Sequence, residues 1–177
     1  NLWITETAVR LALFVTMQTL TKRMGQVGPG SCVNVILAVT ALVAGLSSAV
    51  VVALVSPVLA FLLGIAPQIL TVPAIMIGNT VYVVLLYCIA GKDGKNVVRR
   101  AAAWLVAAFA KFAALYAVVV WIICGVLSEQ LLSAGTLKEP MLNALPATFS
   151  WPQLITALIG SAVAMLITPL IRKALQK

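Results

Sequence analysis

Histidine is absent from this 177-residue chain, and charged residues make up only 9% of it. Without histidine, the sequence lacks the side chain most often used for metal binding and for proton transfer near neutral pH. It also lacks the GxSxG, HExxH and P-loop motifs and any paired carboxylates suited to acid–base catalysis. We therefore expect no catalytic site, no metal site and no cofactor bound by this chain.

Hydrophobic residues, in contrast, make up 63% of the chain. Soluble domains carry about a quarter charged residues, so this composition excludes an ordinary soluble fold. Several apolar stretches are long enough to cross a lipid bilayer. The net charge of +8 does not indicate nucleic acid binding, because the basic residues flank apolar stretches and no nucleic-acid-binding module accompanies them. The sequence predicts an all-α membrane protein.

Glycine, proline and serine interruptions divide the apolar sequence into six predicted transmembrane helices. The main breakers lie at 25–30, 45–48 and 64–68, and a turn lies at 91–96. We therefore predict a compact six-helix bundle that forms a single integral membrane domain over residues 1–177. The predicted helices cover residues 5–24, 31–45, 48–64, 70–90, 97–126 and 151–172.

Capping signals and one polar stretch refine these boundaries. Thr5 or Thr7 can cap the first helix and Asn96 the fifth, because both residue types accept bonds from a first helical turn. Ser150 followed by Gln153 has the pattern of a capping box before the last helix. Residues 127–150 are the most polar stretch of any length, and we predict a long outer loop there.

Seven of the twelve basic residues lie in the 91–100 connection and at the C-terminus. Lysine and arginine near the ends of membrane helices mark the cytoplasmic side. Six spans also place both termini and this connection on one side, in agreement with the charges. We predict cytoplasmic N- and C-termini, with the 127–150 loop outside.

Polar residues at membrane depth are the first candidates for function. Asn34, Asn79 and Lys111 lie within long apolar runs, and Tyr82 shares a helical face with Asn79. An ionisable group at this depth is costly and normally faces the protein interior, paired or near water. No acidic residue lies at the depth of Lys111. Lys111 therefore contacts either an anionic or carbonyl-bearing ligand, or a structural partner on a facing helix; both interpretations remain open.

Aromatic residues form a second candidate group. Tyr116, Trp121 and Trp151 lie toward the predicted outer ends of the fifth and sixth helices. Such residues are typical of the aromatic belt at a membrane interface. Near a long outer loop, they are equally suited to line a ligand pocket.

Small residues and two segments complete the pattern. Alanines four residues apart occur in Ala8–Ala12, a Gly/Pro-rich segment follows the first helix, and Ile77–Tyr82 reads Ile-Gly-Asn-Thr-Val-Tyr. With six short spans and cytoplasmic termini, the chain resembles the substrate-binding S-component of energy-coupling factor (ECF) vitamin transporters. The resemblance covers almost the whole chain.

This resemblance implies a transport subunit and not an enzyme, located in the cytoplasmic membrane of a prokaryote. Such a subunit captures a vitamin at the outer face with high affinity. It then assembles with a transmembrane coupling subunit and two cytoplasmic ATPases, which hydrolyse the ATP. Ala8 and Ala12 match the position of the docking motif on the first helix.

Among S-components, the chain is most similar to the cobalamin-specific type. Since no histidine can ligate the cobalt, shape, stacking and hydrogen bonds would have to hold cobalamin. Pantothenate is the alternative vitamin, because Lys111 or Arg23 could pair with its carboxylate. A non-transport membrane scaffold or a small channel are alternatives of another class. The predicted substrate-binding residues are Gln26, Asn34, Gln68, Asn79, Tyr82, Lys111, Tyr116 and Trp151.

Overall fold

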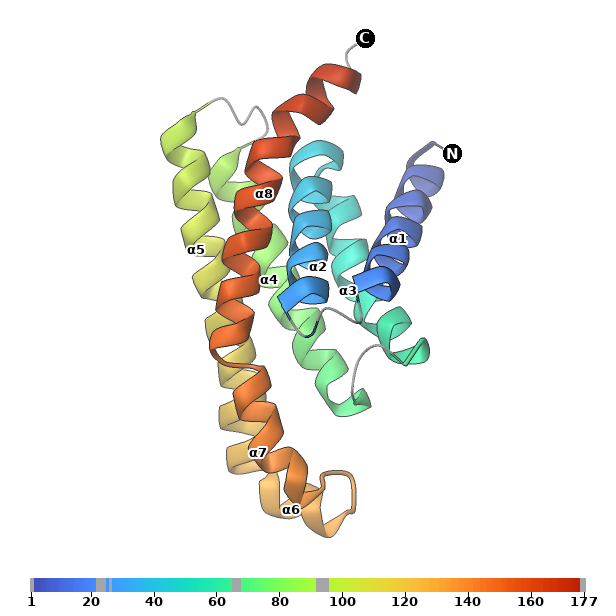
Figure 1. Ribbon diagram of the computed structural model, residues 1–177. Helices are drawn as coiled ribbons and strands as arrows, with labels where there is room; N and C mark the ends of the chain where they lie inside the picture. Colours follow the sequence, from blue (N-terminus) through green and yellow to red (C-terminus); the bar gives the residue numbers. More distant parts are fainter. Residues whose placement is uncertain (1, 22–24, 26, 65–67, 92–95, 176–177) are drawn as a thin grey trace.

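The computed structural model describes residues 2–21, 25, 27–64, 68–91 and 96–175, and the regular structure within these ranges is entirely helical (Figure 1). The all-helical class predicted from the sequence is confirmed. In chain order the elements are α1 (Leu2–Thr21), α2 (Val27–Val39), the π-helix η2 (Thr40–Ala44), α3 (Leu46–Leu62), the 3-10 helix η3 (Ile69–Thr71), α4 (Val72–Ala90), α5 (Val97–Leu115), the π-helix η4 (Tyr116–Val126), α6 (Ser128–Ser133), α7 (Glu139–Thr148) and α8 (Trp151–Leu175).

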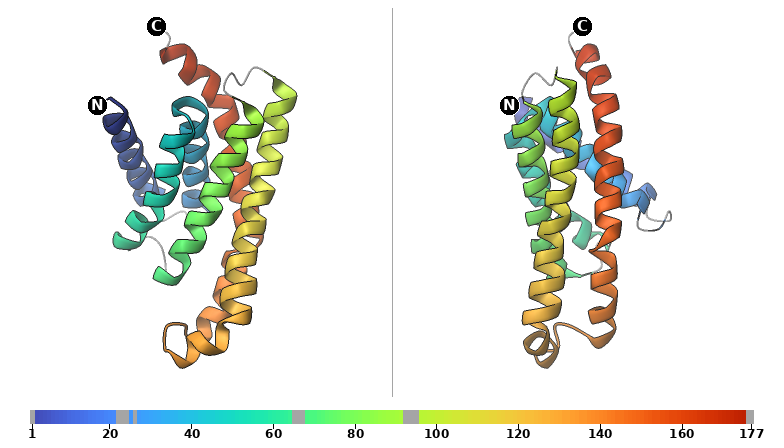
Figure 2. Two further views of the ribbon diagram at one scale, coloured as in Figure 1. Left: turned by 180° about the vertical axis from the view of Figure 1, so that it is seen from behind. Right: turned by 90° about the vertical axis from the view of Figure 1, so that its left-hand side faces the viewer.

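The long helices lie side by side in one bundle (Figures 1 and 2). The most extensive contacts are between α4 and α5, between α2 and α8, and between α3 and α4, whereas α1 packs on α2 and α3. Helix α1 begins and α8 ends at the same end of the bundle, which we call the terminal end. The α6 end, where η4 leads into α6 and α7, lies opposite (Figure 1).

Four helical stretches among the described residues are long and apolar enough to cross a membrane: Val27–Ala44, Ile69–Ala90, Val97–Val126 and Glu139–Ala174. Helix α3, Leu46–Leu62, is also apolar but shorter. These stretches support a multi-pass membrane protein. The count of six spans and the cytoplasmic side of the termini stay predictions.

Residues 127–150 do not form an extended loop, as the sequence suggested, but contain α6 and α7. Their apolar side chains explain this difference. Leu137, Leu145 and Phe149 are buried in one cluster with Val119 and Ile123 of η4. Burial of these apolar side chains therefore outweighs the polar character of the stretch.

The first two helices begin earlier than predicted. Helix α1 starts at Leu2, so neither Thr5 nor Thr7 is its N-cap. Helix α2 starts at Val27, inside the Gly/Pro-rich segment that was expected to break helical structure. Pro29 is tolerated there because N–H groups in the first turn of a helix have no acceptor within the helix. The N–H that proline lacks therefore removes no helical hydrogen bond.

The two predicted caps had different outcomes. Asn96 caps α5 as expected, since its Oδ1 accepts from the backbone N–H groups of Val98 at 3.0 Å and Arg99 at 3.2 Å. The capping box at Ser150 is wrong. The Ser150 hydroxyl donates to the carbonyl of Pro146, and the Gln153 amide donates to the carbonyl of Thr148. Both side chains thereby connect α8 back to α7.

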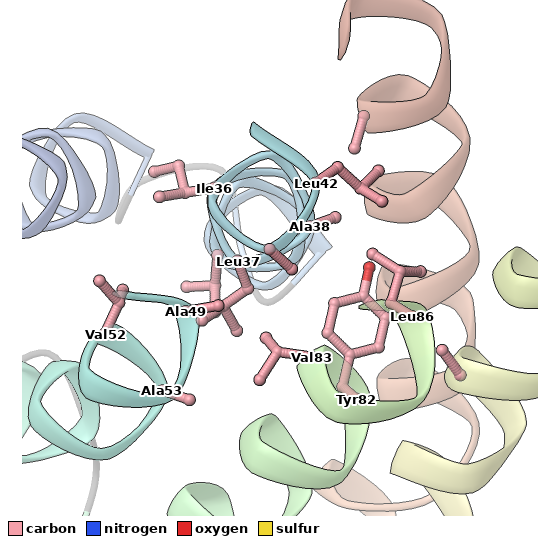
Figure 3. Close-up of a cluster of buried hydrophobic side chains, with 14 of the residues drawn as sticks. Ile36, Leu37, Ala38, Leu42, Ala49, Val52, Ala53, Tyr82, Val83 and Leu86 are labelled. Atoms are coloured by element: carbon pink, nitrogen blue, oxygen red, sulfur yellow. The ribbon is translucent and has the colours of Figure 1, made fainter. Parts of the chain in front are cut away.

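The main apolar core lies between α2, α3 and α4 (Figure 3). Its buried members include Leu37 and Ala38 of α2, Ala49, Val52 and Ala53 of α3, and Val83 and Leu86 of α4. Tyr82 is fully buried within this cluster, with its hydroxyl group at the edge of the apolar packing (Figure 3). The core therefore encloses one aromatic side chain with a polar tip.

Glycines permit the close contact between α2 and α8. A Cβ atom on Gly160 would lie 2.4 Å from the Cβ of Asn34 and 2.8 Å from the backbone oxygen of Ser31. A Cβ on Gly30 would lie 2.9 Å from Cγ2 of Thr156. Small residues allow such close approach of helix backbones in membranes, where van der Waals packing drives helix association.

We predict that Gly160→Ala destabilises the protein by about 1–3 kcal/mol, because the added methyl group collides with the backbone of α2. Gly125→Ala is the matched control, since its added Cβ would meet only the backbone oxygen of Val120, at an ordinary 3.5 Å. Thermal unfolding in detergent measures both. Equal melting temperatures for Gly160→Ala and Gly125→Ala would contradict the proposed packing.

Candidate functional site

The most unusual side chain in the bundle is Lys111 of α5, which is only 3% exposed. Its Nζ donates to Oδ1 of Asn34 on α2 at 2.6 Å and to Oδ1 of Asn79 on α4 at 2.7 Å. The same nitrogen lies 5.3 Å from the ring centroid of Tyr82. The sequence left two interpretations of Lys111 open, a ligand contact and a structural partner on a facing helix. The hydrogen bonds to Asn34 and Asn79 are contacts of the second kind.

The polar contacts continue from Tyr82 to α8. The Tyr82 hydroxyl lies 2.6 Å from Oγ of Ser161, and Ser161 donates its own proton to the carbonyl of Ala157 at 2.7 Å. The Tyr82 hydroxyl also donates to the backbone carbonyl of Asn34 at 3.4 Å, so either hydroxyl can be the donor in the Tyr82–Ser161 pair. Asn34 also donates to the carbonyl of Gly30 at 2.9 Å. We call Asn34, Asn79, Tyr82, Lys111 and Ser161 the polar centre.

Nζ of Lys111 has no acidic partner in the described part of the chain. The acidic residues described there are Glu6, which pairs with Arg10 at 3.2 Å, and Glu129 and Glu139 near the α6 end. Two amide oxygens and the face of an aromatic ring contact Nζ instead. No three histidine, cysteine, aspartate or glutamate residues come together as metal ligands within the described ranges.

Three aromatic rings, one each from α5, η4 and α8, lie close together. Phe112, which follows Lys111, stacks on Trp151 with ring centroids 6.1 Å apart and contacts Tyr116 at 5.9 Å. Trp151 is 69% exposed and Tyr116 is 40% exposed. The three rings, which we call the aromatic group, therefore offer exposed faces on the side toward the α6 end.

Sequence reasoning missed two members of these clusters. Phe112 lies four residues before Tyr116, and this i,i+4 spacing of aromatic residues was an available signal. Ser161 gave no such signal, because serine in a membrane helix most often bonds to its own backbone. Only the packing of α8 on α2 and α5 places it beside Tyr82.

Among the other predicted residues, those that the structure describes make no hydrogen bond to the polar centre. Gln68 precedes η3 and is partly buried, and its carbonyl accepts from Oγ1 of Thr71 at 2.9 Å. Gln26 lies outside the described residues. Ala8 and Ala12 are both exposed on α1, on the side that faces away from the bundle core.

Comparison with known protein families identifies the chain. A family model described as the ECF transporter substrate-specific component matches residues 5–172. The chain belongs to this family. The ECF S-component is a transport subunit and not an enzyme, and it works as part of an ECF transporter. No curated protein and no solved structure matched the chain.

Removing an acceptor of Lys111 should destabilise this S-component. We predict that Asn79→Leu lowers the melting temperature by about 3–10 °C, because the buried ammonium loses one of two strong hydrogen bonds. In the Asn79→Leu background, the further substitution Lys111→Met should restore much of the lost melting temperature, since the donor that needed the acceptor is gone. Ser56→Ala is the control, because the buried Ser56 hydroxyl has no hydrogen-bond partner among the described residues.

An equal loss for Asn79→Leu with and without the Lys111→Met substitution would contradict this account. In that case, Asn79 would stabilise the bundle through packing alone.

Proposed function

We propose that this S-component captures cobalamin with high affinity at the α6 end of the bundle. The observation that carries the proposal is that Nζ of Lys111 already has partners inside the protein. It donates to Asn34 and Asn79 and is buried. A substrate at the candidate site would therefore meet amides, hydroxyls and aromatic rings, which suits a large and mostly neutral ligand more than a carboxylate such as pantothenate.

The aromatic group supplies the proposed contact surface. Trp151 and Tyr116 are exposed, and the Phe112 ring contacts both of them. Ligand sites commonly combine such apolar faces with a few oriented polar groups. The flat conjugated ring of cobalamin can stack on exposed aromatic rings, and its amide side chains can bond to Gln68 and Gln26.

In this proposal the eight predicted residues have two roles. Tyr116, Trp151, Gln68 and Gln26 contact the substrate. Asn34, Asn79, Tyr82 and Lys111 form the floor beneath it and hold the surrounding helices in place. The second role follows from the contacts among these four side chains.

The proposed orientation places the α6 end outside the cytoplasmic membrane of a prokaryote and the terminal end in the cytoplasm. Arg99, Arg100, Arg172 and Lys173 all lie at the terminal end. This agrees with the preference of basic residues for the cytoplasmic side. A transmembrane coupling subunit and two ATPases would then act from that side.

The test is titration calorimetry of the purified protein against cobalamin, pantothenate and folate, without ATP. We predict about nanomolar affinity for cobalamin. Trp151→Ala should weaken it at least about tenfold, because stacked aromatic residues dominate binding energy. Trp121→Ala is the matched control, since Trp121 is 72% exposed and no ring contact involves it in the described structure.

Each other outcome points to a different function. Tight binding of pantothenate alone would replace cobalamin with an anionic vitamin. Binding of no vitamin in the panel would contradict capture of these substrates and favour a scaffold role. Equal losses for Trp151→Ala and Trp121→Ala would remove the aromatic group from the site.

Docking to the coupling subunit is proposed for the exposed face of α1. Ala8 and Ala12 are exposed and four residues apart, so another helix can approach α1 closely there. We predict that Ala8→Trp or Ala12→Trp blocks co-purification with the coupling subunit and leaves vitamin binding unchanged. Ala102→Trp, at an exposed alanine of α5, is the control. Normal assembly of the α1 variants would contradict this docking face.

A further inference from the structure

The basic residues at the terminal end fall into two kinds. Arg99 and Lys173 are exposed. Arg100 is half-buried and donates from α5 to the backbone carbonyl of Met165 in α8. Arg172 is also half-buried and donates from α8 to the carbonyl of Leu42 in η2. Two arginines thus connect helices through backbone carbonyl groups.

The carbonyl of Met165 is free for this contact because of the residue four positions later. In an α-helix each carbonyl accepts from the N–H of residue i+4. For Met165 that residue is Pro169, which has no N–H and whose ring pushes against the same carbonyl. Within a bilayer an unsatisfied carbonyl is costly, so a donor must come from elsewhere in the protein. The Arg100 guanidinium supplies it.

The carbonyl of Leu42 is available for a related reason. The π-helix η2 ends at Ala44, and Gly45 follows with φ 92° and ψ 174°, which lies outside helical conformations. The last carbonyls of a helix have no donor within that helix. Arg172 lies three residues beyond Pro169 and reaches this helix end. Each arginine therefore bonds where a helix is interrupted.

We propose that Arg100 is a positioning residue that replaces the hydrogen bond lost at Pro169. Arg100 joins α5 to α8 at Met165, about one turn before the proline, and Arg172 joins α8 to η2 just after it. The two contacts thus hold α8 on both sides of Pro169. Arg100 and Arg172 thereby have a structural role that the exposed basic residues beside them lack, whatever the substrate.

A double-mutant cycle tests the proposal. Arg100→Met should lower the apparent melting temperature by about 3–10 °C, as expected for the loss of a charge-assisted hydrogen bond. Pro169→Ala restores an N–H that can bond to the Met165 carbonyl. In the Pro169→Ala background the Arg100→Met loss should therefore shrink to less than half. Hydrogen exchange of the peptide covering 166–175 should accelerate in Arg100→Met and return toward the original rate in the double variant.

Matched controls separate this pairing from general effects of charge and of proline removal. Arg99→Met removes the neighbouring exposed guanidinium and should leave the melting temperature unchanged. Pro57→Ala removes the proline inside α3 and should leave the Arg100→Met loss at full size. Arg100→Lys keeps a charged donor, so it should lower the melting temperature less than Arg100→Met does. If Arg100→Met does not insert into the membrane, Arg100→Lys takes its place in the double-mutant cycle. An Arg100→Met loss of equal size with and without the Pro169→Ala substitution would overturn the proposal.

Discussion

Water is absent from the core of a bilayer, so a polar group there that has no partner within the protein is costly. The bonds from Lys111 to Asn34 and Asn79 are the clearest result of this constraint. They join α5 to α2 and α4, and the Tyr82–Ser161 bond adds α8. Four helices are thereby held at one depth by side chains that have few alternative partners.

The chemistry of these partners also shapes the candidate substrate site. An acidic partner for Lys111 would create an ion pair, whereas here two neutral amide oxygens accept from its Nζ. The close fit of Gly160 against Asn34 keeps one of these amides in place. The aromatic group that we propose as the contact surface includes Phe112, which directly follows Lys111 in α5.

Much of this arrangement could be predicted from the sequence, because composition and local signals determine it. Apolar runs predicted the helical class, Asn96 was recognised as a cap, and Asn79, Tyr82 and Lys111 stood out as polar residues in apolar surroundings. Local patterns could not show that residues 127–150 are helical, since burial of Leu137, Leu145 and Phe149 against η4 decides that. The Lys111 partners and the role of Ser161 depend on how distant helices pack. The contact of Arg100 with Met165 was hidden for the same reason, although Pro169 marks the carbonyl that it serves.

Because the chain is an S-component, the decisive question is whether Lys111 keeps its hydrogen bonds when the substrate binds. A high-resolution structure of the protein with its vitamin bound would answer it most directly. The account predicts that Nζ of Lys111 stays on the amide oxygens of Asn34 and Asn79 and that the ligand lies against Trp151 and Tyr116. A structure in which Nζ leaves these amides and bonds to a ligand carboxylate would contradict it.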